Sequence, residues 1–390
     1  MPEQPVGKNI IRLAADSETP DWEPGEEITE WDHAVYRRLV SVELSPEQRA
    51  WLVEPTKCRP KQKSVLAIHW HPEYIPLDLV VRRVKATFPE KENELVIPTQ
   101  HNILLSLDGY SGVEVDCYAP EFNRKIQLLL HFKESEADKA HVLRSMLAHT
   151  FQYRSGQLFE FIDSIVNPAF EDRLNEAVAE TGANEEVIRF ARLHADKMRR
   201  LIELNESTTP AEMIKNKLLS EYYRALAEHH SEFVVNRALQ LIKAVKAIVK
   251  RNFSLEYFYN VHEIIEETRS LGGGVVVPHP EQFWPVLLAD YGVDGYEVWN
   301  PQSREYTEFL INVVNKQNRG RSRGRSLLIF MGDDTHMGEK AKPPASRDPD
   351  SAAREVGVQP AWDDFAIRKS LIVANAGRNK AITEYTARLG

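Results

Sequence analysis

Histidines that follow short apolar runs constrain the fold of this chain more than any other feature of its sequence. Short apolar runs bounded by polar residues are typical of buried strands. Six of the thirteen histidines follow such runs: His69, His71, His101, His131, His279 and His336. In an enzyme whose strands close into a barrel, functional side chains come from the C-terminal ends of several strands. The repetition therefore predicts that these imidazoles converge in space.

Two of the runs carry ligand-type side chains two residues apart. In SVLAIHWH, the alternation of a strand places His69 and His71 on one face and Trp70 on the other. In LLIFMGDDTH, Asp334 and His336 have the same spacing, and the run GVEVD adds Glu114. Imidazoles and carboxylates that converge on one point are typical metal ligands. The sequence therefore predicts a bound metal.

Taken one at a time, these residues also have simpler explanations. Two unrelated histidines on a surface strand would give the same pattern as His69 and His71. His101 and His131 also fit singly hydrogen-bonded histidines at strand ends, and Glu114 also fits the partner of a surface lysine. The other histidines precede the strand-like runs or lie in helical segments: His33, His141, His149, His194, His229, His230 and His262.

Composition excludes several classes of protein. The chain has 390 residues, which exceeds the usual size of one domain. Its formal net charge of −9 argues against non-specific binding to nucleic acid or to anionic membranes, although local basic patches are compatible with it. Two cysteines, Cys58 and Cys117, are too few for a disulfide framework and fit a reducing compartment. Because no segment resembles a signal and no run approaches ~20 apolar residues, we expect a cytoplasmic protein that has no membrane contact.

The pattern of polar and apolar residues changes along the chain and predicts four regions. Residues 1–60 form an N-terminal extension with a helix, and its first thirty or so residues, rich in Pro and Glu, are expected to have little structure of their own. Residues 61–134 and 256–390 alternate strand-like and helical runs, whereas residues 135–255 have helical periodicity only. We therefore expect an α/β barrel in two halves with a large all-helical insertion, followed by a C-terminal loop and helix.

Local signals mark two helix starts. Ser45 is a typical N-cap and Pro46 a typical first helical residue. Thr209, Pro210 and Glu212 repeat this pattern, with the glutamate placed to reach back to the cap. A helix is expected after each.

The order of the strand-end motifs resembles the PHP family, named for polymerase and histidinol phosphatase. In that family a His-x-His strand is followed by Thr-Asp-His-Asn, by Gly-[Val/Ile]-Glu and by a strand ending in His; this chain has HWH, TQHN, GVE and LLLHF. After a helical stretch the family has a glycine-rich strand ending in His-Pro, then Asp-Gly-[Ile/Val]-Glu and Gly-Ser-Asp-x-His; this chain has GGGVVVPHP, DGYEVWN and GDDTH. The resemblance covers residues 64–134 and 257–338.

This resemblance implies a fold, an activity and a set of ligands. The fold would be a distorted (β/α)7 TIM-like barrel of PHP type, and the activity that of a metal-dependent phosphoesterase with two or three divalent ions (Zn, Mn or Fe). Carried over position by position, the implied metal ligands are His69, His71, His101, Glu114, His131, His279, Asp334 and His336. Of these, Glu114, Asp334 and His336 would take part directly in catalysis.

Two positions depart from the family pattern. Pro76 stands where the family usually has an Asp after His-x-His, with Glu73 or Asp78 as substitutes, and Gln100 replaces the Asp of Thr-Asp-His. Both changes bear on the third metal position, so both a dinuclear and a trinuclear site stay open.

Basic residues near the predicted site have two interpretations. Four cations follow the Asp-x-His strand and would either reach the pocket or remain solvated: Lys340, Lys342, Arg347 and Arg354. The loop that carries them is a candidate lid. The basic run at residues 319–325 precedes its strand, which places it on the opposite face of a barrel, where a solvated loop is favoured over a nucleic-acid contact.

Three hypotheses about function follow. The first is a phosphoesterase acting on a small phosphorylated molecule, with nucleic acid as a less favoured substrate. The second is a metal-dependent C–N hydrolase of amidohydrolase type, because metal ligation alone does not distinguish the two. The third is a non-catalytic metal-binding or interaction protein. Substrate, metal identity and oligomeric state are open at this point.

Overall fold

The chain forms two compact units in the computed structural model, which describes residues 27–289, 291–320 and 325–389. One unit combines the described residues up to Ser41 with Gln152–Ser254, and the other combines Val42–Phe151 with the described residues from Leu255 onward. The N-terminal arm expected over the first thirty or so residues lies almost entirely outside the described residues. Among the helices that are described, none has both the length and the apolar character needed to cross a membrane.

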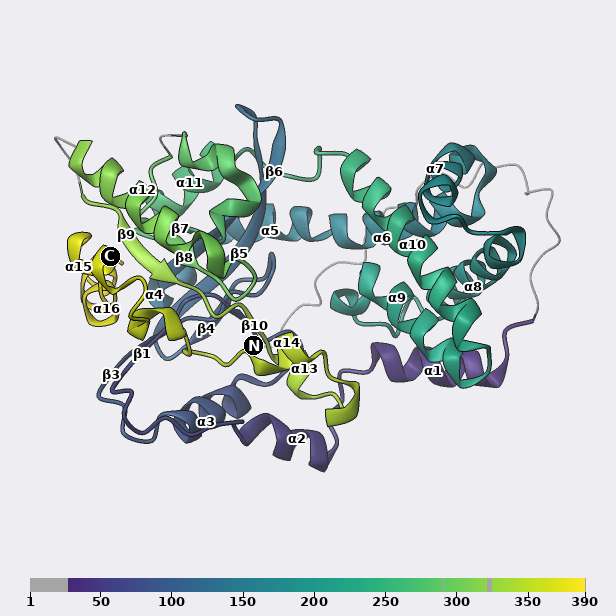
Figure 1. The fold of residues 1–390 in the computed structure, drawn as a ribbon, viewed down its shortest axis with the longest axis horizontal. Coiled ribbons are helices and arrows are strands. Elements are labelled where there is room, and N and C mark those ends of the chain that lie inside the picture. The colour runs from purple at the N-terminus through teal and green to yellow at the C-terminus, as the bar shows by residue number, and fades with distance from the viewer. Residues whose placement is uncertain (1–26, 290, 321–324, 390) are drawn as a thin grey trace. The chain divides into compact units, whose positions relative to one another are not determined.

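The first unit consists of α-helices joined by short turns and 3₁₀ segments (Figure 1). Its α-helices are α1 (Glu30–Val40), α6 (Tyr153–Val166), α7 (Glu171–Thr181), α8 (Glu185–Leu204), α9 (Asn216–Ala225) and α10 (Glu232–Asn252). Helix α10 buries an apolar stripe that includes Ala238, Leu241, Val245 and Ile248, which recur at helical spacing. These side chains join one hydrophobic core with those of the other helices in the unit.

The two predicted helix starts have different outcomes. Ser45 caps α2 (Pro46–Val53) as predicted, and its hydroxyl accepts a hydrogen bond from the backbone of Gln48. The prediction at Thr209 is wrong. Only a three-residue 3₁₀ turn follows Pro210, because the Thr209 hydroxyl donates to the carbonyl of Asn205 instead of capping a new helix.

The second unit is built on a mixed sheet (Figure 1). Its six-stranded sheet has the order β4 (Leu105–Leu107), β5 (Tyr110–Ala119), β6 (Arg124–Lys133), β7 (Gly274–Val277), β8 (Gly295–Trp299) and β9 (Leu328–Met331). Two further pairs are parallel: β1 (Ser64–Ala67) with β3 (Asn93–Val96), and β2 (Trp70–His71) with β10 (Thr335–His336).

In the described part of the chain, the strand ladders do not close into the predicted barrel. Within the six-stranded sheet, strands β4 to β7 pair antiparallel and strands β7 to β9 pair parallel, whereas a (β/α)7 barrel requires parallel strands joined by helices. The reason is local. Strands β5 and β6, of ten residues each, form a hairpin around a short turn in which Asn123 has a positive φ of 49°. A turn of this length joins only antiparallel strands.

Helices and short loops cover the sheet of the second unit. Besides α2, its helices are α3 (Leu77–Thr87), α4 (Glu134–Ala137), α5 (His141–Phe151), α11 (Val261–Ser270), α12 (Thr307–Gly320), α13 (Met337–Lys340), α14 (Pro349–Ala353), α15 (Arg368–Val373) and α16 (Arg378–Thr386). Helix α16 packs against β1, β3 and β9. Its Tyr385 lies so close to Gly274 that a Cβ at that glycine would collide with the phenol ring. This close approach fixes the helix over the start of β7.

Candidate metal centre

Strand pairing brings the two His- and Asp-bearing motifs together. His71 lies directly opposite His336 in the β2–β10 ladder, and the backbone N–H of Asp334 donates to the carbonyl of His69 at 2.9 Å. Trp70 points away from the imidazoles into a hydrophobic core. Segments more than 260 residues apart in the sequence therefore present their imidazoles and carboxylates to one another.

Seven side chains make up a feature that we call the histidine cluster: His69, His71, His101, Glu114, His279, Asp334 and His336. It contains three groups whose ligand atoms lie within 4.8 Å of one another: His69 with Glu114 and His279, His69 with His71 and Asp334, and His71 with His101 and His336. The first and second groups share His69, and the second and third share His71. The cluster therefore offers adjacent candidate metal positions, and these side chains could hold divalent metal.

Glu114 lies at the centre of the cluster. One carboxylate oxygen is 3.6 Å from Nε2 of His279 and 3.9 Å from Nε2 of His69. The other is 2.6 Å from Nδ1 of His101 and 3.5 Å from Nε2 of His71. Unlike the histidines at strand ends, Glu114 lies within β5, where it forms an isolated bridge with His101.

The two carboxylate oxygens of Asp334 have different partners. Oδ1 lies 3.5 to 3.7 Å from the Nε2 atoms of His69, His71 and His336. Oδ2 accepts hydrogen bonds from Gln302 at 2.7 Å and from Arg354 at 3.1 Å. These donors hold the carboxylate so that Oδ1 faces the imidazoles.

Glu297 orients the first histidine of the cluster, and the sequence analysis did not identify it. Its carboxylate lies 2.8 Å from Nδ1 of His69 and also accepts the backbone N–H of His279. A carboxylate on one ring nitrogen fixes the imidazole tautomer and leaves the other nitrogen for a metal. A Cβ at Gly332 would collide with this carboxylate. Glu297 lies in the middle of β8, in the run DGYEVWN, so the strand-end pattern did not single it out.

Strained backbone is concentrated at the cluster. Of the seven described non-glycine residues with positive φ, four lie in it or beside it: Glu73 (56°), Asn102 (54°), His279 (27°) and Asp334 (46°). Such conformations cost on the order of 1–3 kcal/mol each and persist where the surrounding structure enforces them. This concentration indicates a functional site.

Burial and neighbouring charges shift the pKa values of the titratable groups in the cluster in opposite directions. Burial disfavours charge on His69, but the carboxylates of Glu297 and Asp334 outweigh it and raise the pKa of His69 to about 10. Burial lowers the pKa of His71 to about 3, with His101 and His336 adding to the effect. Although burial acts to raise it, the pKa of Glu114 lies well below its usual range because of His101. Carboxylates that stay ionised among imidazoles form a donor set that a cation stabilises.

The donor chemistry of the cluster fits divalent metal. Nitrogen and carboxylate oxygen donors are the usual ligands of Zn, Mn and Fe. Nε2 of His69 is buried and has no hydrogen-bond partner among the described residues. Because buried polar atoms in proteins are almost always paired, this atom is a candidate ligand.

His131 is the one predicted ligand that the structure does not bring into the cluster. Both of its ring nitrogens are engaged, Nδ1 with the hydroxyl of Tyr385 at 2.7 Å and Nε2 with the carbonyl of Ile68 at 3.0 Å. A nitrogen already hydrogen-bonded to protein is not free to bind metal. The strand-end pattern did not distinguish this histidine from the others because its hydroxyl partner lies at the far end of the sequence.

The two departures from the family pattern have a structural outcome. Glu73, not Asp78, approaches the cluster, since its carboxylate lies 3.6 Å from Nδ1 of His336 and accepts the backbone N–H of Gly338. Asp78 is exposed in the first turn of α3. The side chain of Gln100 accepts the backbone N–H of Glu73 at 2.9 Å and so helps to position that residue.

Of the four cations after the Asp-x-His strand, Arg354 contacts the cluster by donating to Asp334. Lys340 is buried and donates to the backbone carbonyls of Ala352 and Arg354. Arg347 donates to the carbonyls of Lys340 and Lys342. The basic run predicted at residues 319–325 is largely outside the described residues, because positions 321–324 are not among them.

Comparisons with known proteins do not assign this chain to a family. No protein-family model matches this chain, and no curated protein matches it. Among solved structures it is similar to a putative metal-dependent phosphoesterase from Bifidobacterium adolescentis, with 16% sequence identity, a TM-score of 0.41, and coverage of 81% of this chain and 98% of the other. A TM-score of 0.41 is too low to assign a family, so membership in the PHP family stays a prediction from the motifs.

Proposed function

We propose that this protein is a metal-dependent phosphoesterase that hydrolyses a phosphate ester at the histidine cluster. The observation that carries the proposal is the guanidinium of Arg354 beside Asp334. Its Nη1 lies 3.1 Å from the Asp334 carboxylate, and its Nε is buried with no hydrogen-bond partner among the described residues. A guanidinium matches the several oxygens of a phosphate, whereas an amide offers one carbonyl oxygen. Arg354 therefore favours phosphate esters over C–N substrates.

The chain itself would hold and orient the metal ligands. Divalent ions in such a site polarise a phosphoryl oxygen and lower the pKa of a water molecule. Glu114 has imidazoles on both of its carboxylate oxygens, and Asp334 presents one oxygen to three imidazoles. His336, whose side chain is 36% exposed, is the member of the cluster most open to a substrate. We assign the catalytic roles to Glu114, Asp334 and His336.

A small phosphorylated molecule is the proposed substrate. A cavity of about 320 Å³ borders Asp333, the residue before Asp334, and is lined by Arg59, Arg304 and Arg354. Its lining also carries four carboxyl groups, from Asp333, Asp350, Glu355 and Asp364, so it has no surplus of positive charge. Pockets for small ligands are typically about 300–1,000 Å³, and it is the volume of this cavity that supports a small substrate.

The test is a substrate screen with metal added. The protein, stripped with chelator and reloaded with Mn, Zn or Mg, is assayed for phosphate or alcohol release from phosphomonoesters and phosphodiesters, and for ammonia release from amides. We expect turnover of phosphate esters that chelator abolishes. Turnover of the amide panel alone, or no metal-dependent turnover of either panel, would overturn the proposal.

A further inference from the structure

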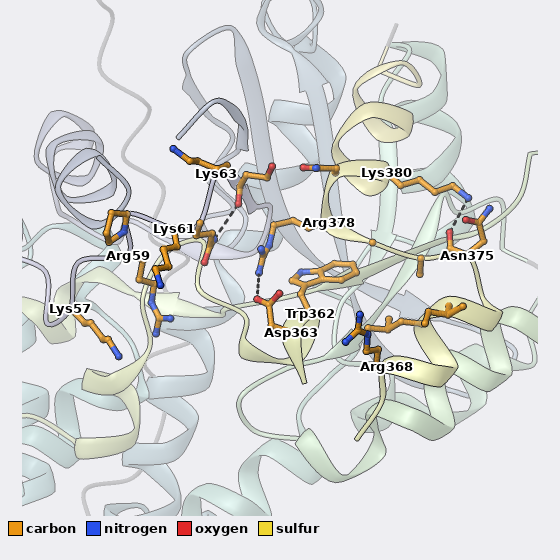
Figure 2. Close-up of a pocket in the computed structure, with 18 of the residues that line it drawn as sticks. Lys57, Arg59, Lys61, Lys63, Trp362, Asp363, Arg368, Asn375, Arg378 and Lys380 are labelled. Carbon is orange, nitrogen blue, oxygen red and sulfur yellow. Dashed lines mark hydrogen bonds and ion pairs between the residues drawn. The ribbon is translucent and has the colours of Figure 1, made fainter. Parts of the chain in front are cut away.

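A second cavity, at the opposite end of β1 from His69 and His71, has no role in the proposed hydrolysis. It has a volume of about 1160 Å³ and is lined by residues 57–64, 362–363, 368 and 371–380 (Figure 2). Ser64, the first residue of β1, lies at its wall, whereas His69 and His71 follow the other end of that strand. At about 3.3 Å per extended residue, Ser64 and His69 are separated by up to roughly 16 Å of chain.

The walls of this cavity, which we call the cationic cavity, are strongly basic. Seven of its lining residues are cationic and one is acidic, Asp363; the cations are Lys57, Arg59, Lys61, Lys63, Arg368, Arg378 and Lys380. This concentration contrasts with the net charge of −9 over the whole chain. Clefts lined by one sign of charge attract ligands of the opposite sign.

Most of these cations are available to a ligand. No carboxylate among the described residues pairs with Lys57, Arg59 or Lys61. Lys63 has an exposed partner in Glu90, and exposed pairs of this kind contribute little. Arg378 is 3.5 Å from Asp363, while its Nε is buried with no hydrogen-bond partner among the described residues. The cavity therefore holds positive charge that the surrounding carboxylates do not neutralise.

The first turn of α16 adds backbone donors to the same wall. Gly377 is the N-cap and supplies no side-chain hydrogen bond to the helix. Gly377, Arg378 and Lys380 all line the cavity. N–H groups in the first turn of a helix have no partner within the helix and bind anions readily. The cations and the helix start therefore act on the same ligand.

We infer that the cationic cavity binds single-stranded nucleic acid. Figure 2 shows Trp362 between Arg368 and Arg378. Its ring is half-buried against the hydrophobic core, and we assign its remaining exposed part to stacking on a base. Basic grooves with an aromatic platform are how proteins bind single strands. The volume exceeds the ~300–1,000 Å³ typical of small-ligand pockets, and long exposed side chains from three segments suit a run of phosphates. This inference does not rest on the proposed hydrolysis.

The test compares two variants of equal charge by fluorescence anisotropy. The probe is a labelled oligothymidylate of about 12 nucleotides in about 50 mM salt. The cavity variant carries Lys57→Gln, Lys61→Gln and Arg368→Gln. The control carries the exposed substitutions Arg189→Gln, Lys217→Gln and Lys243→Gln on the helical unit. Arg59 is left intact because it also lines the cavity beside Asp333.

We expect the cavity variant to bind the oligonucleotide at least about tenfold more weakly than the control. Its plot of log affinity against log salt should be shallower by about 2, since each lost phosphate contact on a single strand contributes about 0.7. The inference is overturned if wild type does not bind the probe, if both variants bind it equally, or if ATP or inorganic polyphosphate competes at concentrations as low as those of unlabelled oligonucleotide. Hydrolysis measured in parallel with a small phosphate ester should be unchanged in both variants.

Discussion

The histidine cluster and the cationic cavity lie at opposite ends of β1 and are built in contrasting ways. Five of the seven residues of the cluster are buried, and the ligand atoms of each of its groups lie within 4.8 Å of one another. The cavity has a volume of about 1160 Å³ and its cations are mostly exposed. The first arrangement specifies a ligand by short-range geometry, whereas the second attracts ligands by the sum of its charge. The two regions should therefore respond to different perturbations.

The largest effect is expected at the centre of the cluster. Glu114→Gln keeps the shape of the side chain but removes the charge that faces four imidazoles. Mutation of a residue that orients a metal ligand typically costs 10- to 100-fold in metal affinity or activity, and we expect a loss of this size for Glu297→Gln. For Glu114→Gln we expect a larger loss of turnover, about a thousandfold, because this carboxylate faces the cluster directly. Steady-state kinetics at saturating metal measures both. Equal losses in the two variants would contradict the central position of Glu114.

A pH experiment separates the buried cation Lys340 from the exposed cations of the cavity. Burial lowers the pKa of Lys340 to about 8 from 10.5. Between these values the unfolded chain holds a proton that the folded chain lacks, so the free energy of unfolding should rise with pH through this window, by up to about 3 kcal/mol. Lys340→Met should remove this rise. Denaturant unfolding of both proteins between pH 8 and 10.5 measures it, and parallel curves would show that Lys340 is not the group responsible.

His131 tests which imidazoles belong to the cluster. His131→Ala removes its contacts with Tyr385 and Ile68 and opens space in a buried region, so we expect the free energy of unfolding to fall by about 2 kcal/mol. Metal content should not change. Denaturant melts measure the free energy of unfolding, and metal analysis measures the metal content. The loss of a metal equivalent would show that His131 is a ligand.

The smallest effect is expected at Arg354. Arg354→Gln should raise KM for a phosphate ester about tenfold, the value of roughly one charged hydrogen bond, with little change in metal content. Arg347→Gln is the matched control because the contacts of Arg347 within the described residues are with backbone carbonyls and the ring of Trp51. If both variants behave alike, the preference for phosphate over amide substrates loses its support.

The sequence allowed much of the cluster to be predicted, because a ligand residue at a strand end leaves a local signal. His69, His71, Asp334 and His336 lie at or beside the ends of short buried strands, and residues two apart share a face. His131 has the same local signal, yet it is hydrogen-bonded to Tyr385, about 250 residues later. Its status depends on tertiary contacts that the local pattern does not encode.

Two features of the second unit were not predicted, the hairpin of β5 and β6 and the cationic cavity. The hairpin of β5 and β6 is set by a turn whose conformation local composition did not reveal, and it changes a parallel barrel into a mixed sheet. The cationic cavity gathers Lys57, Arg368 and Lys380 from three separate segments. Residues 57–63 alone carry four of its seven cations, a local signal that the sequence analysis did not use, but the other three join them only after folding.

Metal content per chain tests the central claim, that the histidine cluster binds divalent metal, most directly. Wild type, His69→Ala and His194→Ala are reloaded with Mn or Zn, desalted and analysed by inductively coupled plasma mass spectrometry. His194 is the control because it is also buried but lies in the helical unit. We predict at least two equivalents in wild type and in His194→Ala, and the loss of at least one in His69→Ala, since two of the three groups share His69. Less than about one equivalent in reloaded wild type, or equal content in all three proteins, would contradict the claim.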